Sequence, residues 1–206
     1  MAGSSEDVID SLAGIPPGSA LDAVRARRPH ARDQAQASFR ALFEPEHAGG
    51  MSLPERFAVA TFVAAVHAQP ETAAFYRTRL AGAGAPAALQ SALDEAVGAA
   101  AAHGPYGSYP PGPLSTEDRA GPMLRIAEAS RAALGPRLAA ALQHAHMLVF
   151  HPRDAAPEQL EALLGAGWST TAIVTLSQLV AFLAYQIRAI AGLRTLAAHS
   201  GPARPP

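Results

Sequence analysis

The hydrophobic pattern of this chain is helical along most of its length. Apolar residues recur at helical spacing in Ala-rich segments that Gly and Pro separate, without a run of alternating β-branched residues. The pattern is sharpest over Met51–Leu80. There Ser52 and Glu55 form a Ser-x-x-Glu capping box, and Phe57–Val66 is almost entirely apolar. A helix that is apolar on every side is buried on every side, so we predict an all-α fold with this helix at a domain centre or between subunits.

A second helix follows the first after a short break. Gln69 lies near its cap position, and Pro70 occupies the first helical position, where proline is favoured. We expect the helix to end at about Leu80, because Gly82 and Gly84 come directly afterwards.

The remaining Gly, Pro and Ser positions predict an N-terminal helical arm over residues 1–50 and helices on either side of a loop. In the arm, a helix starts near Ser19 and another covers Pro29–Phe43. The arm could wrap its own core or a neighbouring subunit. An Ala-rich helix over Ala87–Ala102 leads into a Gly, Pro and Tyr-rich loop at 103–113, after which Ser115 is placed to cap the next helix. Residues 200–206 are expected to be a disordered tail.

Composition limits the classes of function. A chain of 206 residues suits one well-buried domain, and charged residues make up only 16% of it, so we expect other subunits to cover part of the surface. The 16 basic residues, all Arg, nearly balance the 17 acidic ones, which argues against nucleic-acid binding. The chain has no cysteine, and this excludes a disulfide, a thiolate metal site and a thiol redox centre within it.

The N-terminus gives no sign of a signal peptide, because MAGSSEDVID is acidic and lacks an apolar region. Polar residues interrupt the longest apolar run, Ala172–Ile187, which is shorter than the roughly 20 residues that span a bilayer. We therefore expect a cytoplasmic protein without a membrane partner.

Three segments resemble the carboxymuconolactone decarboxylase (CMD) and alkylhydroperoxidase AhpD-like superfamily. Its redox segment reads roughly Glu-Arg-Glu, an apolar helix, then Cys-x-x-Cys-x-x-x-His, and Glu55-Arg56 matches the start of this pattern. Arg137–Ala155 is similar to the family's second-half helix with its Pro-containing turn, and Pro157–Leu196 to its closing helix pair. The resemblance implies an AhpD-like helical domain over 51–199 in a bacterial homo-oligomer.

The residues that perform the family's chemistry are replaced here. In the gapless alignment the relay glutamate falls on Phe57, the two cysteines on Gln69 and Thr72, and the histidine on Tyr76. In the family the cysteine pair opens a helix, whose positive dipole end favours a thiolate. Neither Gln69 nor Thr72 can form one, so the resemblance implies this scaffold without thiol peroxidase chemistry.

Polar residues near this segment are candidates for another chemistry. His67 could act as an acid or base, Glu71 could hold a proton or cation, and Tyr76 could donate a hydrogen bond to a ligand. A structural interpretation serves equally, because His67 is favoured at a helix C-terminus and Glu71 at a helix N-terminus.

Two further groups could line a pocket or an interface. Gln178, Tyr185 and Arg188 form one stripe on the apolar C-terminal helix, and a polar stripe on a buried helix needs partners. Tyr106 and Tyr109 lie on the Gly/Pro loop, where they could cover an apolar pocket or make a subunit contact.

The sequence HAHMLVFH raises the question of a metal site. On a continuous helix His144 and His151 share a face and His146 points away, while Met147 and Leu148 hold the positions where an acidic ligand would complete the set. We therefore predict no metal site and no cofactor, with His151 at a helix end.

Three functions remain open. The first is a cysteine-less CMD/AhpD-like protein that binds a small apolar or aromatic compound. The second is a non-catalytic oligomeric partner of an active alkylhydroperoxidase-like protein. The third is an alkylhydroperoxidase or decarboxylase-type enzyme with a non-thiol site. As an enzyme it would resemble the decarboxylases, which also work without the cysteine pair, although their usual histidine aligns with Tyr76.

Overall fold

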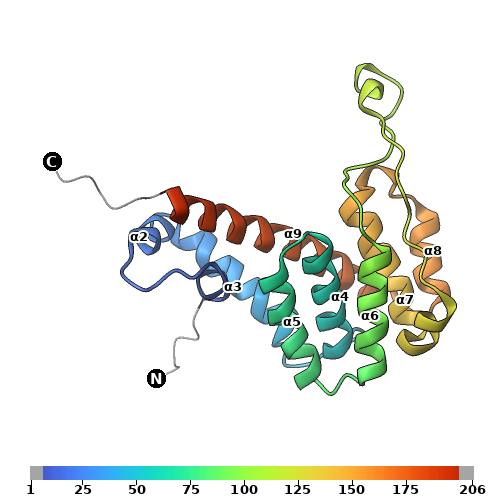
Figure 1. Cartoon of the computed structure of the whole chain (residues 1–206), viewed down its shortest axis with the longest axis horizontal. Coiled ribbons are helices and arrows are strands. Elements are labelled where there is room, and N and C mark those ends of the chain that lie inside the picture. The colour runs from blue at the N-terminus through green and yellow to red at the C-terminus, as the bar shows by residue number, and fades with distance from the viewer. Residues whose placement is uncertain (1–6, 200–206) are drawn as a thin grey trace. The chain divides into compact units, whose positions relative to one another are not determined.

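The computed structural model describes residues 7–199, and within them the chain is built from helices and loops (Figure 1). This confirms the predicted all-α fold. The chain divides into two compact units. The terminal unit contains described residues 7–45 and 184–199, and the central unit contains residues 46–183. The sequence-based boundaries at 1–50 and 51–199 stay a prediction, and the expected tail at 200–206 lies outside the described residues.

The terminal unit holds three short helices and the end of a long one. These are α1 (Val8–Ala13), α2 (Ala20–Ala26), α3 (Pro29–Phe43) and the last part of α9 (Thr170–His199). The Ser19 hydroxyl caps α2 by accepting a hydrogen bond from the Asp22 amide at 3.2 Å, as predicted. The arm contacts the C-terminal helix, because the Arg194 guanidinium donates to the Leu12 carbonyl at 2.6 Å.

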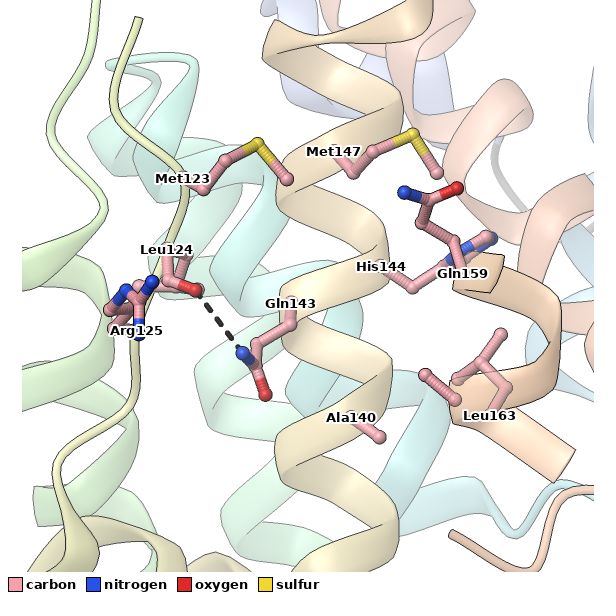
Figure 2. A pocket seen from close by; sticks show the side chains of 10 residues that line it. Met123, Leu124, Arg125, Ala140, Gln143, His144, Met147, Gln159 and Leu163 are labelled. Atoms are coloured by element: carbon pink, nitrogen blue, oxygen red, sulfur yellow. Dashed lines mark hydrogen bonds between the residues drawn. The ribbon is translucent and has the colours of Figure 1, made fainter. Parts of the chain in front are cut away.

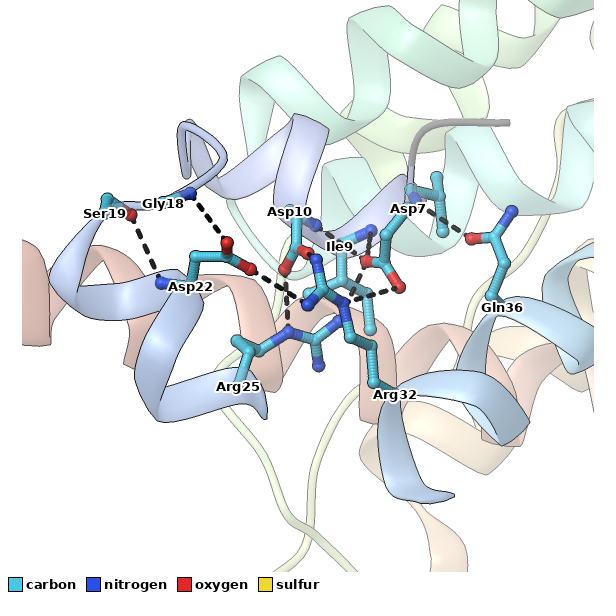
Figure 3. Close-up of polar contacts among 10 residues, drawn as sticks. Asp7, Ile9, Asp10, Gly18, Ser19, Asp22, Arg25, Arg32 and Gln36 are labelled. Atoms are coloured by element: carbon cyan, nitrogen blue, oxygen red, sulfur yellow. Dashed lines mark hydrogen bonds and ion pairs between the residues drawn. The ribbon is translucent and has the colours of Figure 1, made fainter. Parts of the chain in front are cut away.

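An ion cluster joins the helices of the terminal unit (Figure 3). Arg25 donates to Asp10 at 2.7 Å and to Asp7 at 2.8 Å, while Arg32 pairs with Asp10 and with Asp22, the latter at 2.9 Å. Asp10 is 4% exposed, so its charge depends on these two guanidinium groups. The cluster is a structural feature that ties α1, α2 and α3 together.

The central unit is organised around one buried helix. Its elements are α4 (Leu53–Val66), α5 (Pro70–Gly82), α6 (Ala87–Ala99), α7 (Glu128–Phe150), α8 (Pro157–Gly165) and the first part of α9. The predicted capping box is present, with the Ser52 amide donating to the Glu55 carboxylate at 2.7 Å. Every residue from Arg56 to Ala64 is buried, and α4 packs against α5, α6 and α7. The helix is therefore central, as its all-round apolar character predicts.

Arg137 links the start of α4 to the turn between α8 and α9. Its guanidinium pairs with Glu55 at 2.6 Å, donates to the Gly167 carbonyl at 2.5 Å and to that of Gly50, and lies over the Trp168 ring at 4.1 Å. Trp168 is 2% exposed, so its ring is part of the packed core. One side chain thus fixes several separate segments of the central unit.

The loop before α7 reaches away from the helices of the central unit as a two-stranded stem (Figure 1). Gly107 and Arg119 exchange backbone hydrogen bonds of 2.8 and 3.1 Å, and the tip holds a 3₁₀ turn, η1 (Pro113–Glu117). The prediction that Ser115 caps the next helix was wrong. Ser115 lies inside η1 and its hydroxyl accepts from the Gly112 amide at 3.0 Å, whereas α7 begins only at Glu128.

One helix in the described residues is long and apolar enough to cross a membrane on length and composition alone. It is α9, which has 30 residues and a mean hydropathy of 1.5 over its most apolar window. Half of that window is buried against the protein, so the same values describe the core helix of a folded domain.

Candidate functional site

At the turn between α4 and α5, where the resemblance places the family's redox centre, most of the aligned residues are buried. Phe57, Thr72 and Tyr76 are buried, with exposed fractions of 7%, 0% and 0%. Gln69 stands at the N-cap of α5 but makes no capping hydrogen bond through its side chain. It lines an open depression of about 330 Å³ that is otherwise apolar apart from Arg77, which pairs with Asp94.

The predicted trio does not converge on that depression. His67 is the half-buried C-cap of α4, Glu71 is exposed in the first turn of α5, and Tyr76 is fully buried in the helix interior. None of the three lines the depression. The places of His67 and Glu71 at helix ends agree with the structural interpretation, in which each complements a helix dipole.

The stripe on α9 is exposed rather than buried. Tyr185 is 47% exposed, and Gln178 and Arg188 also face outward, with Arg188 donating to the Ala184 carbonyl of its own helix at 2.9 Å. The premise that these residues need buried partners was therefore wrong within one chain. The assignment of these residues to a pocket or an interface stays a prediction.

The two loop tyrosines have structural contacts. Tyr106 is 7% exposed, its hydroxyl accepts a hydrogen bond from the His103 amide at 3.1 Å, and its ring is 5.1 Å from that of His151. A Cβ atom at Gly121 would stand 2.2 Å from the Tyr106 ring, so only glycine permits this approach. Tyr109 is half-buried beneath the Arg153 guanidinium at 4.0 Å.

A groove on the outer face of α7 has features of a binding site (Figure 2). Its floor is α7, one wall is the extended segment 123–125, and the other wall is α8. The volume is about 290 Å³. Figure 2 shows His144 pointing from α7 toward α8 and the two methionine side chains at the same end of the groove. The lining residues are Met123, Leu124, Arg125, Ala140, Gln143, His144, Met147, Gln159, Ala162 and Leu163.

His144 is the polar group that sets this groove apart. His144 is only 6% exposed, and neither of its ring nitrogens has a hydrogen-bond partner among the described residues. Burial lowers the pKa of His144 below the ordinary value of 6.5, so its imidazole is neutral near pH 7. A neutral imidazole carries one donor and one acceptor, and leaving both unpaired costs about 1–3 kcal/mol for each group.

The two glutamines of the groove differ in the hydrogen-bonding groups that they leave available to a ligand. Gln143 is occupied, because its amide nitrogen donates to the Leu124 carbonyl at 3.2 Å and its oxygen accepts from Arg131 at 3.3 Å. The oxygen of Gln159 accepts from the Ala156 amide at 2.8 Å, which leaves its NH₂ group to donate. Gln143 thus holds the wall, and Gln159 adds a donor beside His144.

The other two histidines of HAHMLVFH are arranged differently from the helical-wheel prediction. α7 ends at Phe150, and His151 is its C-cap with φ −127°, so the periodicity that would align His151 with His144 no longer applies. His146 and His151 instead lie together, their ring centroids 6.0 Å apart. The expected position of His151 at a helix end is confirmed.

Burial also lowers the pKa of His146, and the nearby His151 lowers it further, while a hydrogen bond with the backbone of Ala100 opposes the shift. Across residues 7–199, no three His, Asp or Glu side chains come close enough together to hold a metal ion. The groove therefore offers hydrogen bonds and apolar contact.

No protein-family model, curated protein or solved structure matches this chain.

Proposed function

We propose that this chain is a cysteine-less CMD/AhpD-like protein that binds a small aromatic compound in the α7 groove, without thiol peroxidase chemistry. The observation that carries the proposal is His144, a buried neutral imidazole that faces the groove with both nitrogens unpaired. A fold tolerates such a group at a cost in stability, and a ligand that pairs with it recovers that cost.

The lining favours a ligand with a ring and a hydroxyl. A phenolic hydroxyl can donate to one nitrogen of His144 and accept from the NH₂ group of Gln159. Met123 and Met147 can place their thioethers against the ring, a contact that is favourable at about 0.3–1.5 kcal/mol. A volume of about 290 Å³ accommodates one ring with a short substituent.

Binding is better supported than turnover. The ten lining residues include no hydroxyl, thiol or carboxylate side chain, so His144 has no nucleophile to activate. The depression at the α4–α5 turn is likewise lined by no hydroxyl, thiol or carboxylate side chain. The enzyme alternatives would need a reacting group that neither place supplies.

One observation favours the second function, a non-catalytic oligomeric partner. Leu160 and Leu164 lie one turn apart on α8 and are 44% and 48% exposed, and Val174 near the start of α9 is 55% exposed. Exposed apolar residues at helical spacing are typical of a subunit contact. A chain that forms oligomers but binds no small molecule would support this function instead.

The ligand proposal is tested by calorimetric titration with phenol, toluene and benzoate. We expect phenol to bind most tightly, and His144→Phe to weaken phenol binding at least tenfold while toluene binding is kept. The matched control is Thr72→Val, because the Thr72 hydroxyl is also buried without a partner but lies outside the groove. Equal losses in both variants would contradict the site, and a preference for benzoate would replace the hydroxyl ligand by an anion at Arg125.

A further inference from the structure

The outer face of α9 carries a single line of exposed residues. From Thr171 to Gly192 the exposed positions follow one another at alternating spacings of three and four, and every position between them is buried or half-buried. Residues at this spacing lie on one side of a helix. The same spacing continues to Thr195, so the line has eight members, which we call the α9 seam: Thr171, Val174, Gln178, Ala181, Tyr185, Arg188, Gly192 and Thr195.

The composition of the α9 seam is unlike that of a helix face exposed to solvent. Such a face is usually rich in charged residues, whereas Arg188 is the only charged residue among the eight. Val174 and Tyr185 are 55% and 47% exposed, although each has a large apolar surface to bury. The seam is also narrow, with two exposed positions in every seven, the pattern along which two helices pack in a coiled coil. It therefore has the character of a helix-packing surface.

The spacing of the α9 seam is symmetric about Leu183. Seam residues lie two, five, nine and twelve positions before Leu183, and others lie at the same four separations after it. A second copy of α9 that runs in the opposite direction, centred at this level, therefore places every seam residue opposite another seam residue. In a two-fold dimer such contacts are reciprocal, because residue i meets residue j and residue j meets residue i.

The apolar pairs formed in this register are complementary in size. Tyr185 lies opposite the partner's Ala181, two positions from the centre on each helix. Val174 lies opposite the partner's Gly192, nine positions from the centre. In both pairs a large side chain meets a small one, which lets two helices approach closely without leaving a void.

The polar pairs are complementary in hydrogen bonding. Arg188 lies opposite the partner's Gln178, whose amide oxygen can accept from a guanidinium. The Arg188 side chain donates to the Ala184 carbonyl at 2.9 Å, and its five N–H groups leave donors for a partner. The two Arg188 side chains of the dimer are ten positions apart, about 15 Å along the helix axis, so they do not face each other.

A parallel pair would lack this complementarity, because each seam residue would then face its own copy. Arg188 would meet the partner's Arg188, and the two charges would repel. Two Gly192 residues would leave a gap at one level, while two Tyr185 rings would crowd the level below. The antiparallel pair also brings the full length from Thr171 to Thr195 into contact, about 36 Å of helix.

We propose that α9 forms the interface of a homodimer, in which two copies of the helix pack antiparallel along the α9 seam about a two-fold axis at the level of Leu183. The second copy covers the exposed polar stripe of Gln178, Tyr185 and Arg188 and supplies its hydrogen-bond partners. The dimer goes beyond the proposed function, and neither depends on the other, because no seam residue lines the α7 groove.

The register is tested by disulfide formation, which has no background because the chain contains no cysteine. Two differently tagged full chains, one with Gln178→Cys and one with Arg188→Cys, are produced together and oxidised. We expect a disulfide that joins the two tags. Each variant oxidised alone should form none, because its two cysteines would lie about 15 Å apart along the axis, beyond the roughly 7 Å between Cα atoms that a disulfide spans.

The other results of this experiment count against the register. A disulfide in Gln178→Cys alone, without one in the mixture, would indicate parallel helices and overturn the proposal. A mixture in which the two tags are never joined would overturn it as well.

The interface is tested by sedimentation equilibrium of the full chain, which should show twice the mass of one chain. In Ala181→Glu the two new carboxylates would lie four positions apart, about 6 Å along the axis, and each would displace the contact with the partner's Tyr185. We expect the dissociation constant to rise about a hundredfold. Ala181 is exposed in the single chain, so the helical content by circular dichroism should not change.

Leu164→Glu is the matched control, because Leu164 is 48% exposed on α8 and lies outside the α9 seam. It should keep the dimer. A chain that is monomeric at tens of micromolar, or a dimer that survives Ala181→Glu, would overturn the proposal. A dimer that dissociates equally in both variants would also overturn it, since the α9 seam would then not be the specific contact.

Discussion

The α4–α5 turn and the α7 groove are two places in the central unit where the sequence carries polar residues, and they use them differently. At the turn, Thr72 and Tyr76 are fully buried, and Gln69 lines an open depression of about 330 Å³ whose other residues are apolar except Arg77. At the groove, His144 is buried but faces a volume of about 290 Å³ with two unpaired ring nitrogens. The first place is where the sequence resemblance predicts a redox centre, and the second combines a recess with unpaired ring nitrogens.

A residue that aligns with a catalytic residue of another family therefore need not have its chemistry. The resemblance concerns the helix starts and the apolar faces, which determine packing. A site additionally needs polar atoms that the fold leaves without partners and a space beside them. The groove has both, whereas at the turn the unpaired hydroxyl of Thr72 does not line the depression.

The largest expected effect comes from placing a glutamate at Phe57, where the sequence resemblance aligns a relay glutamate. Phe57 is 7% exposed in the all-buried helix α4, so Phe57→Glu places a carboxylate in the core without a partner. We expect a loss of about 3–5 kcal/mol in the free energy of unfolding, measured by urea denaturation. Phe57→Leu is the control and should cost far less, because it keeps the site apolar. A Phe57→Glu chain as stable as the original would show that the turn still accommodates the family's charge.

The pH dependence of the free energy of unfolding should depend on His144 in the groove. The folded-state pKa of His144 lies below its unfolded value of about 6.5, so the unfolded chain binds the proton more readily. The contribution of His144 to the free energy of unfolding is therefore fully present above pH 6.5, and it is lost as the pH falls through the folded pKa. The slope from this residue is at most about 1.4 kcal/mol per pH unit.

His144→Phe should remove the part of that slope that His144 contributes. It should also raise the free energy of unfolding at neutral pH by about 1–2 kcal/mol, because it eliminates a buried unpaired group. Urea denaturation at pH 7.5 and 5.0 measures both effects. A slope that is unchanged in His144→Phe would mean that His144 is not buried as a neutral imidazole. His146 remains in this variant and accounts for the part of the slope that persists.

The smallest effect on stability is expected from a cysteine pair at the turn. Gln69 is the N-cap of α5 and Thr72 faces the core one turn later, which is the placement of a Cys-x-x-Cys pair at a helix start. Gln69→Cys combined with Thr72→Cys should form a reducible disulfide, detected by thiol titration before and after reduction. Two thiols that stay free under oxidising conditions would show that the alignment with the redox segment is displaced.

The helices with strong local signals could be predicted from the sequence. The capping box and apolar run locate α4, and Pro70 and Pro29 mark the starts of α5 and α3. The six-residue helix α1 was missed because it is too short for a periodic pattern. Its local signals are Asp7, which caps the helix, and Gly14, which ends it with φ 70°.

The site could be predicted only in part. HAHMLVFH drew attention to His144, but the wall of the groove lies in a loop whose position depends on contacts between residues far apart in the chain. These are Gln143 with Leu124 and His151 with Pro122. No local pattern specifies such contacts, and the helical spacing of His151 was misleading because the chain leaves the helix there.

The central claim is that ligands bind at the α7 groove and not at the α4–α5 turn. The most direct measurement is to map NMR chemical-shift changes of the full chain during titration with phenol. We expect saturable shifts of the His144 ring, the Met147 methyl group and the Gln159 side-chain amide. Saturable shifts at His67, Gln69 and Ala73, with the groove unchanged, would contradict it.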